Sequence, residues 1–239
     1  MAFTTAKSAY LKGLADGSPF ILVIIPFSLL FGLVAVEAGL SVFETLAFSV
    51  VVIAGAAQFT ALQLMQENAP TVVILASALA VNLRMAMYSA SLTPYIGSAK
   101  LWQRALMAYV TVDQSYIVSI AKFEKEPQMT VPQRVAYFFG AVTPVVPLWY
   151  AFTLVGALLG AQVPDSWALD FAIPITFLAM IAPMFRTLAH VVAALVAVVV
   201  ALLAAGVPYS LGLIIAGIAG MMAGARTELW LTQREGAKP

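Results

Sequence analysis

The sequence predicts an all-α protein, a polytopic bundle of about eight transmembrane helices with almost no water-soluble part. Of its 239 residues, 62% are apolar and only 10% are charged, and the mean hydropathy is +0.97. A water-facing surface cannot be built from so few charges. Because each crossing of the ~30 Å hydrocarbon core needs about 20 apolar residues, the chain has room for about eight crossings and no separate catalytic domain.

Apolar windows follow one another along the chain, and each is predicted to cross the membrane once. They are residues 19–38, 42–65, 71–91, 101–121, 133–160, 167–183, 187–205 and 208–225. The second window contains the small residues Gly55, Ala56 and Ala57, and the fourth carries Arg104 and Asp113. Seven crossings plus a re-entrant segment is therefore the alternative arrangement.

The distribution of Lys and Arg predicts which helix ends face the cytoplasm. With eight crossings, one side receives Lys7, Lys12, Lys122, Lys125, Arg134, Arg186, Arg226, Arg234 and Lys238. Both termini are therefore expected in the cytoplasm. Residues 1–239 would form one integral membrane domain, with a cytoplasmic segment at about 1–17, a bundle at about 18–226 and a cytoplasmic tail at 227–239. Lys100 and Arg104 are exceptions, because this arrangement places them outside.

Proline residues inside the apolar windows predict broken helices. They are Pro26, Pro144, Pro147 and Pro174. A proline removes a backbone hydrogen bond and bends a helix unless neighbouring groups compensate. Several breaks in one small chain resemble the discontinuous helices that form substrate sites in transporters, although Pro is also common in ordinary membrane helices.

Several classes of function are disfavoured by composition. The net charge is +1 with no basic tract, so no nucleic-acid partner is expected. The chain has no Cys and a single His, His190, which leaves no thiolate or multi-histidine metal site within it. No ATP-binding glycine-rich loop and no His-Glu-x-x-His segment occurs. We therefore expect no cofactor and no enzymatic activity.

Two charges fall deep inside apolar windows, Arg84 and Asp113. A charge at the centre of a membrane helix costs about 3 kcal/mol, so each one needs a partner or a water-filled cavity. At helical spacing, Tyr88 and Ser91 share a face with Arg84, and Tyr109 and Tyr116 share a face with Asp113. One interpretation is a structural ion pair that fixes helix register. The other, which the extra hydroxyl groups favour, is a binding site for a zwitterionic or ionic substrate.

Small residues suggest two further features. Gln58 follows a small-residue run in which a helix could unwind and expose backbone N–H groups to an anion, although such a run also suits close helix packing. Small residues recur at every fourth position of the last window, at Gly212, Ala216, Gly220 and Gly224. This stripe predicts close packing against another helix, either of this chain or of a partner subunit, and the partner subunit is the contact we expect.

Several segments, in order and spacing, resemble the AzlC-type large subunit of branched-chain amino acid exporters. They are Pro26-Phe27 with Gly32, Ala54-Gly55-Ala56-Ala57-Gln58-Phe59, Asn82-Leu83-Arg84 followed by Tyr88 and Pro94, and Asp113. The resemblance runs from about Gly13 to Met180. Two positions depart from the family pattern: Met85 replaces a His, and Gln114 replaces an acid.

The resemblance implies a cytoplasmic-membrane permease that exports leucine, isoleucine, valine and related amino acids with a small hydrophobic AzlD-type subunit. Arg84 and Asp113 would match the substrate's carboxylate and ammonium groups. Gln58, Asn82, Tyr88 and Tyr116 complete the expected substrate site. The alternatives are an intramembrane scaffold or assembly subunit and an intramembrane enzyme.

Overall fold

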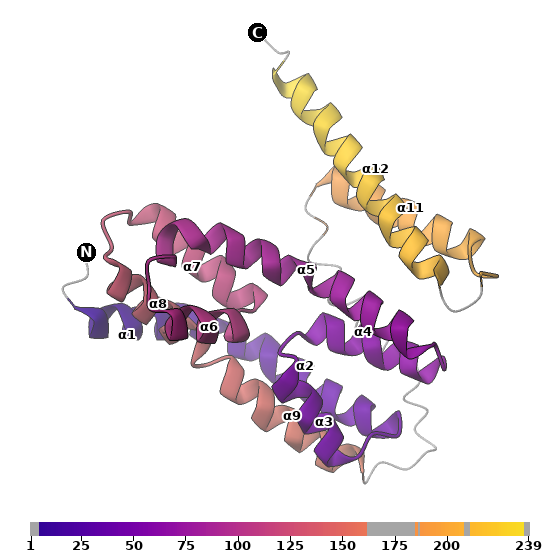
Figure 1. Cartoon of the computed structure of the whole chain (residues 1–239), viewed down its shortest axis with the longest axis horizontal. Helices are drawn as coiled ribbons and strands as arrows, with labels where there is room; N and C mark the ends of the chain where they lie inside the picture. The colour runs from indigo at the N-terminus through magenta and orange to yellow at the C-terminus, as the bar shows by residue number, and fades with distance from the viewer. Residues whose placement is uncertain (1–4, 162–184, 186, 208–210, 237–239) are drawn as a thin grey trace. The chain divides into compact units, whose positions relative to one another are not determined.

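The computed structural model describes residues 5–161, 185, 187–207 and 211–236, and its regular elements over these residues are all helical. The helices are α1 (Ala6–Gly17), the short 3-10 helix η1 (Ser18–Phe20), α2 (Ile21–Glu37), α3 (Val42–Val51), α4 (Gly55–Gln66), α5 (Thr71–Ile96), α6 (Leu101–Val110), α7 (Asp113–Lys125), α8 (Val131–Val142), α9 (Val146–Gly160), α11 (Leu188–Leu203) and α12 (Leu211–Gly236) (Figure 1). The predicted crossing at 167–183 lies outside the described residues.

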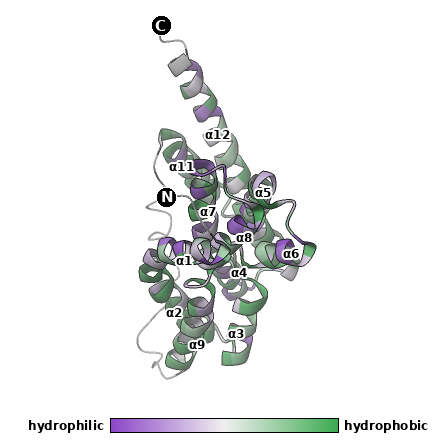
Figure 2. Ribbon diagram, turned by 90° about the vertical axis from the view of Figure 1, so that its left-hand side faces the viewer, coloured by the Kyte–Doolittle hydropathy of each residue, from purple (hydrophilic) through white to green (hydrophobic). Residues whose placement is uncertain are grey.

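The described residues contain four helical stretches long and apolar enough to cross a membrane. They are Ala6–Glu37, Thr71–Ile96, Val131–Gly160 and Leu211–Arg234. Apolar residues predominate along α2, α3 and α9 (Figure 2). The polytopic helical bundle predicted from the sequence is confirmed. The continuous helical stretch Ala6–Glu37 passes through the predicted boundary after residue 17, and α12, which continues to Gly236, passes through the one after residue 226.

The chain divides into two compact units. The first comprises residues 1–62 and 78–170, and the second comprises 63–77 and 171–239. In the second unit α11 and α12 pack as an antiparallel pair, because Gly212 lies beside Ala204 whereas Gly224 lies beside Ala193. All other features described below belong to the first unit unless stated.

Two long, interrupted helices form the frame of the first unit. The stretch α1–η1–α2 packs in parallel along α8–α9, with α1 against α8 and α2 against α9. Glycines bring the backbones together: a Cβ atom at Gly140 would lie 2.1 Å from the Tyr10 carbonyl oxygen, and one at Gly32 would lie 2.1 Å from the Thr153 carbonyl oxygen. Only glycine permits so close an approach.

The predicted proline breaks are confirmed at one of the described positions. The helix ends at Val142, and residues 143–145 form a turn that contains Pro144. Pro147 is instead accommodated in the first turn of α9, where its missing N–H costs little. Pro26 lies inside an uninterrupted α2, so the break expected there is absent. Pro174 lies outside the described residues.

The second predicted crossing, 42–65, is a helical hairpin. The helix ends at Val51, residues 52–54 are extended or irregular, and α4 begins at Gly55. Phe48 on α3 and Phe59 on α4 both contact the ring of Phe31 on α2, at centroid distances of 5.8 and 5.4 Å, so the two helices approach α2 at the break between them. With limbs of about 15 and 18 Å, neither helix can cross a ~30 Å core.

The fourth predicted crossing, 101–121, is a second hairpin. After α5 ends, α6 returns along the Ser89–Gly97 half of that helix, and the chain breaks at Thr111 and Val112. From there α7 runs in the direction of α5, since Arg84 meets Asp113 near the break and Tyr95 meets Phe123 about three helical turns later, at 5.7 Å between ring centroids. Helices α6 and α7 are therefore antiparallel (Figure 1).

These hairpins favour the alternative arrangement, in which a re-entrant segment replaces a full crossing, over eight full crossings. Two of the eight windows, 42–65 and 101–121, are each broken into two short helices, which is the backbone form of a re-entrant segment. The second hairpin also removes the charge exception. Lys100 at the start of α6 and Lys122 and Lys125 at the end of α7 now lie at one end of the molecule, where Arg134 donates to the Tyr95 carbonyl oxygen at 3.1 Å.

Candidate functional site

The broken tips of the two hairpins meet. Tyr109, in the last turn of α6, donates its hydroxyl hydrogen bond to the Val50 carbonyl oxygen in the last turn of α3. Its hydroxyl also lies 3.0 Å from that of Tyr150 on α9. Tyr109 was predicted to share a helical face with Asp113. This prediction is wrong, because the chain is not helical between the two residues.

Asp113 is the first residue of α7. The Arg84 Nη1 atom on α5 lies 3.2 Å from the Asp113 Oδ2 atom, which confirms the predicted ion pair. The start of a helix carries a partial positive charge from its unpaired N–H groups, which further stabilises a carboxylate there. Side-chain exposures of 21% for Arg84 and 33% for Asp113 leave the pair accessible from outside the protein interior.

This ion pair is incomplete. An arginine and a carboxylate can form two parallel hydrogen bonds, but here one contact is made. Within the described part of the chain, Arg84 Nε and Asp113 Oδ1 are enclosed and have no hydrogen-bond partner. The Oδ1 atom of Asn82, two residues before Arg84, is in the same state. A pair that served only to join two helices would leave fewer polar atoms unsatisfied.

Aromatic and hydroxyl side chains extend the site along α5 and α7. The rings of Tyr88 and Tyr116 stack with centroids 4.1 Å apart and planes inclined by 9°. The Ser91 and Tyr116 hydroxyl oxygens lie 3.0 Å apart. Four of the six predicted site residues are therefore brought together: Arg84, Tyr88, Asp113 and Tyr116.

A cavity of about 230 Å³ lies between α5 and α6, and Arg84, Tyr88, Asp113 and Tyr116 are not among its lining residues. Thr111, two residues before Asp113, lines it together with Ser89, which follows Tyr88. The rest of its lining includes Leu92, Ile96 and Met107 and one basic residue, Arg104. A largely apolar hollow with a few polar groups is typical of sites for small ligands.

Gln58 lies apart from the ion pair, in a neutral cluster at the first hairpin. Its side chain is fully buried, and its Nε2 atom donates to Ser49 Oγ at 3.1 Å. Ser49 Oγ lies 3.2 Å from Thr153 Oγ1 on α9. Sequence reasoning missed Ser49 and Thr153, because a single hydroxyl residue in an apolar window carries no distinguishing signal.

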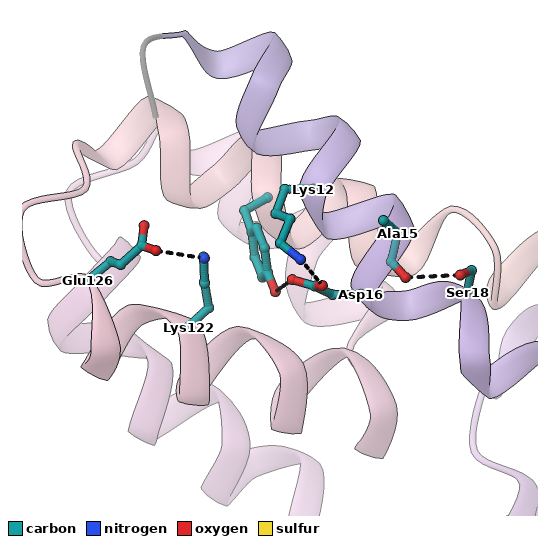
Figure 3. Close-up of polar contacts among 7 residues, drawn as sticks. Lys12, Ala15, Asp16, Ser18, Lys122 and Glu126 are labelled. Carbon is teal, nitrogen blue, oxygen red and sulfur yellow. Dashed lines mark hydrogen bonds and ion pairs between the residues drawn. The ribbon is translucent and has the colours of Figure 1, made fainter. Parts of the chain in front are cut away.

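A second group of charges joins α1, α7 and α8 (Figure 3). Lys12 pairs with Asp16 within α1, and Lys122 Nζ lies 2.7 Å from Glu126 Oε1 at the end of α7. Tyr137 of α8 donates to Asp16 Oδ2 at 2.7 Å. Both acids are thus matched by a lysine one turn away, as in a cluster that anchors helix ends.

The small-residue stripe of the last window lies in the second unit and packs against α11 of the same chain. A Cβ atom at Gly220 would lie 2.8 Å from the Ala193 carbonyl oxygen and 2.9 Å from the Ala197 Cβ atom. Gly212 and Gly224 face α11 in the same way, and Ala216 is buried. The stripe therefore makes the close helix contact that the sequence predicts, with α11 of the same chain, and the contact of Gly212, Ala216, Gly220 and Gly224 with a partner subunit stays a prediction.

The paired broken hairpins, the apolar helices and the ion pair between α5 and α7 define a multi-pass membrane protein with discontinuous helices at a central site. The sequence profile of the AzlC protein family matches residues 19–163, more than half of the chain. The chain belongs to the AzlC family. The matched region runs from η1 to the end of α9 and so contains both hairpins.

Two relatives support this assignment. The chain is similar to the Inner membrane protein YgaZ of Escherichia coli (strain K12), with 24% identity over 186 residues that cover 75% of each chain. It is also similar to an uncharacterized membrane protein of Archaeoglobus fulgidus, with 28% identity over 183 residues, which are 74% of this chain and 77% of the relative. No solved structure matches the chain.

Proposed function

We propose that this protein is the large subunit of a secondary transporter that exports branched-chain and related apolar amino acids across the cytoplasmic membrane. The observation that carries the proposal is the incomplete pair of Arg84 and Asp113 at the broken tip of the second hairpin. It offers one positive and one negative group on partly exposed side chains, together with two enclosed polar atoms, Arg84 Nε and Asp113 Oδ1, that have no hydrogen-bond partner within the described residues.

A free amino acid complements this arrangement. Its α-carboxylate would bind Arg84, where the Nε atom still has a hydrogen to donate. Its ammonium group would bind Asp113, where Oδ1 can still accept. Binding would add the missing hydrogen bonds without leaving a charge unpaired, and such charge-assisted bonds are the strongest that a small ligand can form.

The cavity between α5 and α6 would suit an apolar side chain. Leu92, Ile96 and Met107 line it, and its volume of about 230 Å³ is ample for a leucine or methionine side chain. A hydrophobic pocket separates ligands that differ by one methylene group by only ~1–3 kcal/mol. We therefore expect a transporter that accepts several apolar amino acids rather than one.

The broken helices support a transport mechanism. Discontinuous helices at a central site are typical of transporters that work by alternating access. A small hydrophobic AzlD-type subunit is the partner we propose for the second moving surface. The grouping of Lys100, Lys122, Lys125 and Arg134 at one end of the first unit supports a cytoplasmic position for that end, and we propose the same side for both termini.

Transport in proteoliposomes tests the proposal. The full chain would be reconstituted alone and with the small hydrophobic protein encoded beside its gene, and radiolabelled valine, leucine and methionine would be followed. We expect gradient-driven flux of all three, with little flux of glutamate or lysine. In cells, deletion of the gene should raise intracellular accumulation of the same amino acids, and overexpression should lower it.

Two other functions predict different results. A scaffold or assembly subunit would give no flux in any combination but would be needed for another complex to assemble. An intramembrane enzyme would convert its substrate without moving it across the bilayer. Absence of flux with a folded, correctly inserted pair of subunits would reject the transporter.

A further inference from the structure

The first hairpin contains a group of buried oxygen atoms that the amino-acid site does not use. We propose that these atoms form a binding site for a monovalent metal cation of the size of Na⁺. The side chains of Thr45, Ser49, Gln58 and Thr153 make up this neutral cluster. The inference deepens the proposed function, because such a cation would couple amino-acid export to an ion gradient. The site itself is argued independently of the substrate.

The burial of this neutral cluster is the first observation. All four side chains are 0% exposed, and they come from three helices, α3, α4 and α9. A hydroxyl or amide group removed from water costs free energy unless its hydrogen bonds are replaced. Two oxygen atoms in the cluster, Gln58 Oε1 and Thr45 Oγ1, have no hydrogen-bond partner within the described residues. Thr45 lies one turn before Ser49 on the same face of α3.

The chemistry of the cluster selects a monovalent cation. It contains no carboxylate, amine or imidazole, so it cannot carry a proton near neutral pH. Its oxygen atoms can all act as acceptors, which are the ligands that hard cations prefer. A divalent ion would need carboxylate ligands to offset its charge, and these four side chains provide none.

The spacing of the oxygen atoms also fits. Ser49 Oγ and Thr153 Oγ1 are 3.2 Å apart, and the Gln58 amide nitrogen is 3.1 Å from Ser49 Oγ. Half a turn of the amide group exchanges its nitrogen and oxygen atoms, which places Oε1 at that distance. Oxygen ligands about 2.4 Å from an octahedral cation lie about 3.4 Å from one another, so small shifts would complete the shell.

The helix break adds a further contribution. Ser49 lies in the last turn of α3, whose C-terminal end carries a partial negative charge. In transporters with discontinuous helices, C-terminal half-helix ends and unwound backbone carbonyls bind Na⁺. The first hairpin therefore presents the polarity that a cation requires at the place where the oxygen atoms gather.

Binding of ²²Na⁺ to the purified full chain in detergent tests the site directly. We expect saturable binding of about one ion per chain that K⁺ and choline do not displace, and a rise in the thermal unfolding temperature at about 0.15 M NaCl relative to choline chloride. Thr153→Val, which keeps the side-chain shape and removes one oxygen, should weaken Na⁺ affinity at least about tenfold. Ser49→Ala is the second variant, for use if Thr153→Val does not fold.

The matched control is Ser119→Ala on α7, which removes an equally buried and unpartnered hydroxyl group outside the cluster. It should bind Na⁺ as the unchanged protein does. No saturable Na⁺ binding by the folded chain, or equal affinity in the cluster variants, would overturn the site. The transport assay tests the proposed function independently of this site. Na⁺ binding without amino-acid flux would support the cation site and reject the proposed substrate.

Discussion

The two hairpins share a backbone design but differ in chemistry. Each consists of two short helices that meet at a break of two or three residues, and the tips touch through Tyr109 and Val50. The α6–α7 tip holds a charged, partly exposed pair, Arg84 and Asp113. The α3–α4 tip holds a neutral, fully buried cluster around Gln58.

Comparing the two hairpins distinguishes what the helix break contributes to ligand binding from what the side chains contribute. A break exposes backbone polar groups and brings two helix ends together in both hairpins. The sign and strength of binding then depend on the side chains beside the break. We therefore assign the zwitterionic substrate to the charged tip and a monovalent cation to the neutral tip.

The largest expected effect concerns the side of the membrane on which the loops before the two hairpins lie, because the hairpin description depends on it. The chain lacks cysteine, so single cysteines can be introduced at Ser98, between α5 and α6, and at Leu40, between α2 and α3. If each hairpin enters and leaves at one end, an impermeant thiol reagent should label Leu40→Cys from outside and Ser98→Cys only after permeabilisation. Eight full crossings would expose both positions to the outside.

A reporter fusion checks the same arrangement independently. A reporter that is active only in the periplasm should be silent after Pro239 and active near Gln162. The reverse pattern would invert the orientation while leaving the hairpins in place.

The next largest effect is expected at the charged tip. Asp113→Asn keeps the side-chain size and removes the charge, and it should lower leucine transport about a hundredfold or more because Arg84 loses its partner. Initial rates in proteoliposomes, normalised to inserted protein, measure this effect. Glu124→Gln makes the same chemical change at an exposed position of α7 and should transport normally. Equal loss in both variants would mean that α7 is generally sensitive to charge.

The sequence predicted the central pair but not the path of the backbone around it. Arg84 and Asp113 stood out because charges are rare and costly in apolar windows, and their pairing is confirmed. Hydropathy cannot distinguish a hairpin from a crossing helix, since both expose apolar side chains to lipid. The misplaced Lys100 and Arg104 were the sequence signal of the second hairpin.

The sequence indicated the first helix break but not the second. Gly55 and the alanines after it marked the first, because small residues tolerate unwinding and close approach. The second falls at Thr111 and Val112, between residues with no breaking tendency, and is held by tertiary contacts such as that of Tyr109. Propensity therefore could not reveal it, and the shared face expected for Tyr109 and Asp113 failed for that reason.

A moderate effect is predicted at the tip of the first hairpin. A Cβ atom at Gly55 would lie 2.7 Å from Phe27 Cε1 and 2.9 Å from Trp149 Cη2. Gly55→Ala should therefore destabilise the protein by about 1–3 kcal/mol through overpacking. Thermal unfolding in detergent measures the loss. Gly206→Ala is the control, because no atom lies within 4 Å of a Cβ there, and an equal loss in both variants would contradict tight packing at the tip.

The smallest effect is predicted for the α11–α12 pair, which has no break. Gly220 faces α11, whereas a Cβ atom at Gly217 on the same helix would meet nothing within 4 Å. Gly217→Ala should stabilise α12 by about 0.5–1 kcal/mol through helix propensity. Gly220→Ala should not show this stabilisation, because its Cβ atom would lie too close to Ala193 and Ala197. The measurement is the difference between the unfolding temperatures of the two variants. Equal unfolding temperatures would contradict tight packing of Gly220 against α11 and would favour a contact between this stripe and a partner subunit.

The most direct test of the charged tip removes both charges together. Replacing a buried ion pair by apolar residues of similar volume often leaves stability unchanged, so Arg84→Leu combined with Asp113→Leu should insert and fold. Leucine flux through the purified double variant, reconstituted with the small hydrophobic subunit, is the measurement. We predict flux no higher than in empty liposomes at normal abundance of the folded protein. Flux equal to that of the unchanged protein would show that the pair only joins α5 to α7 and that the substrate binds elsewhere.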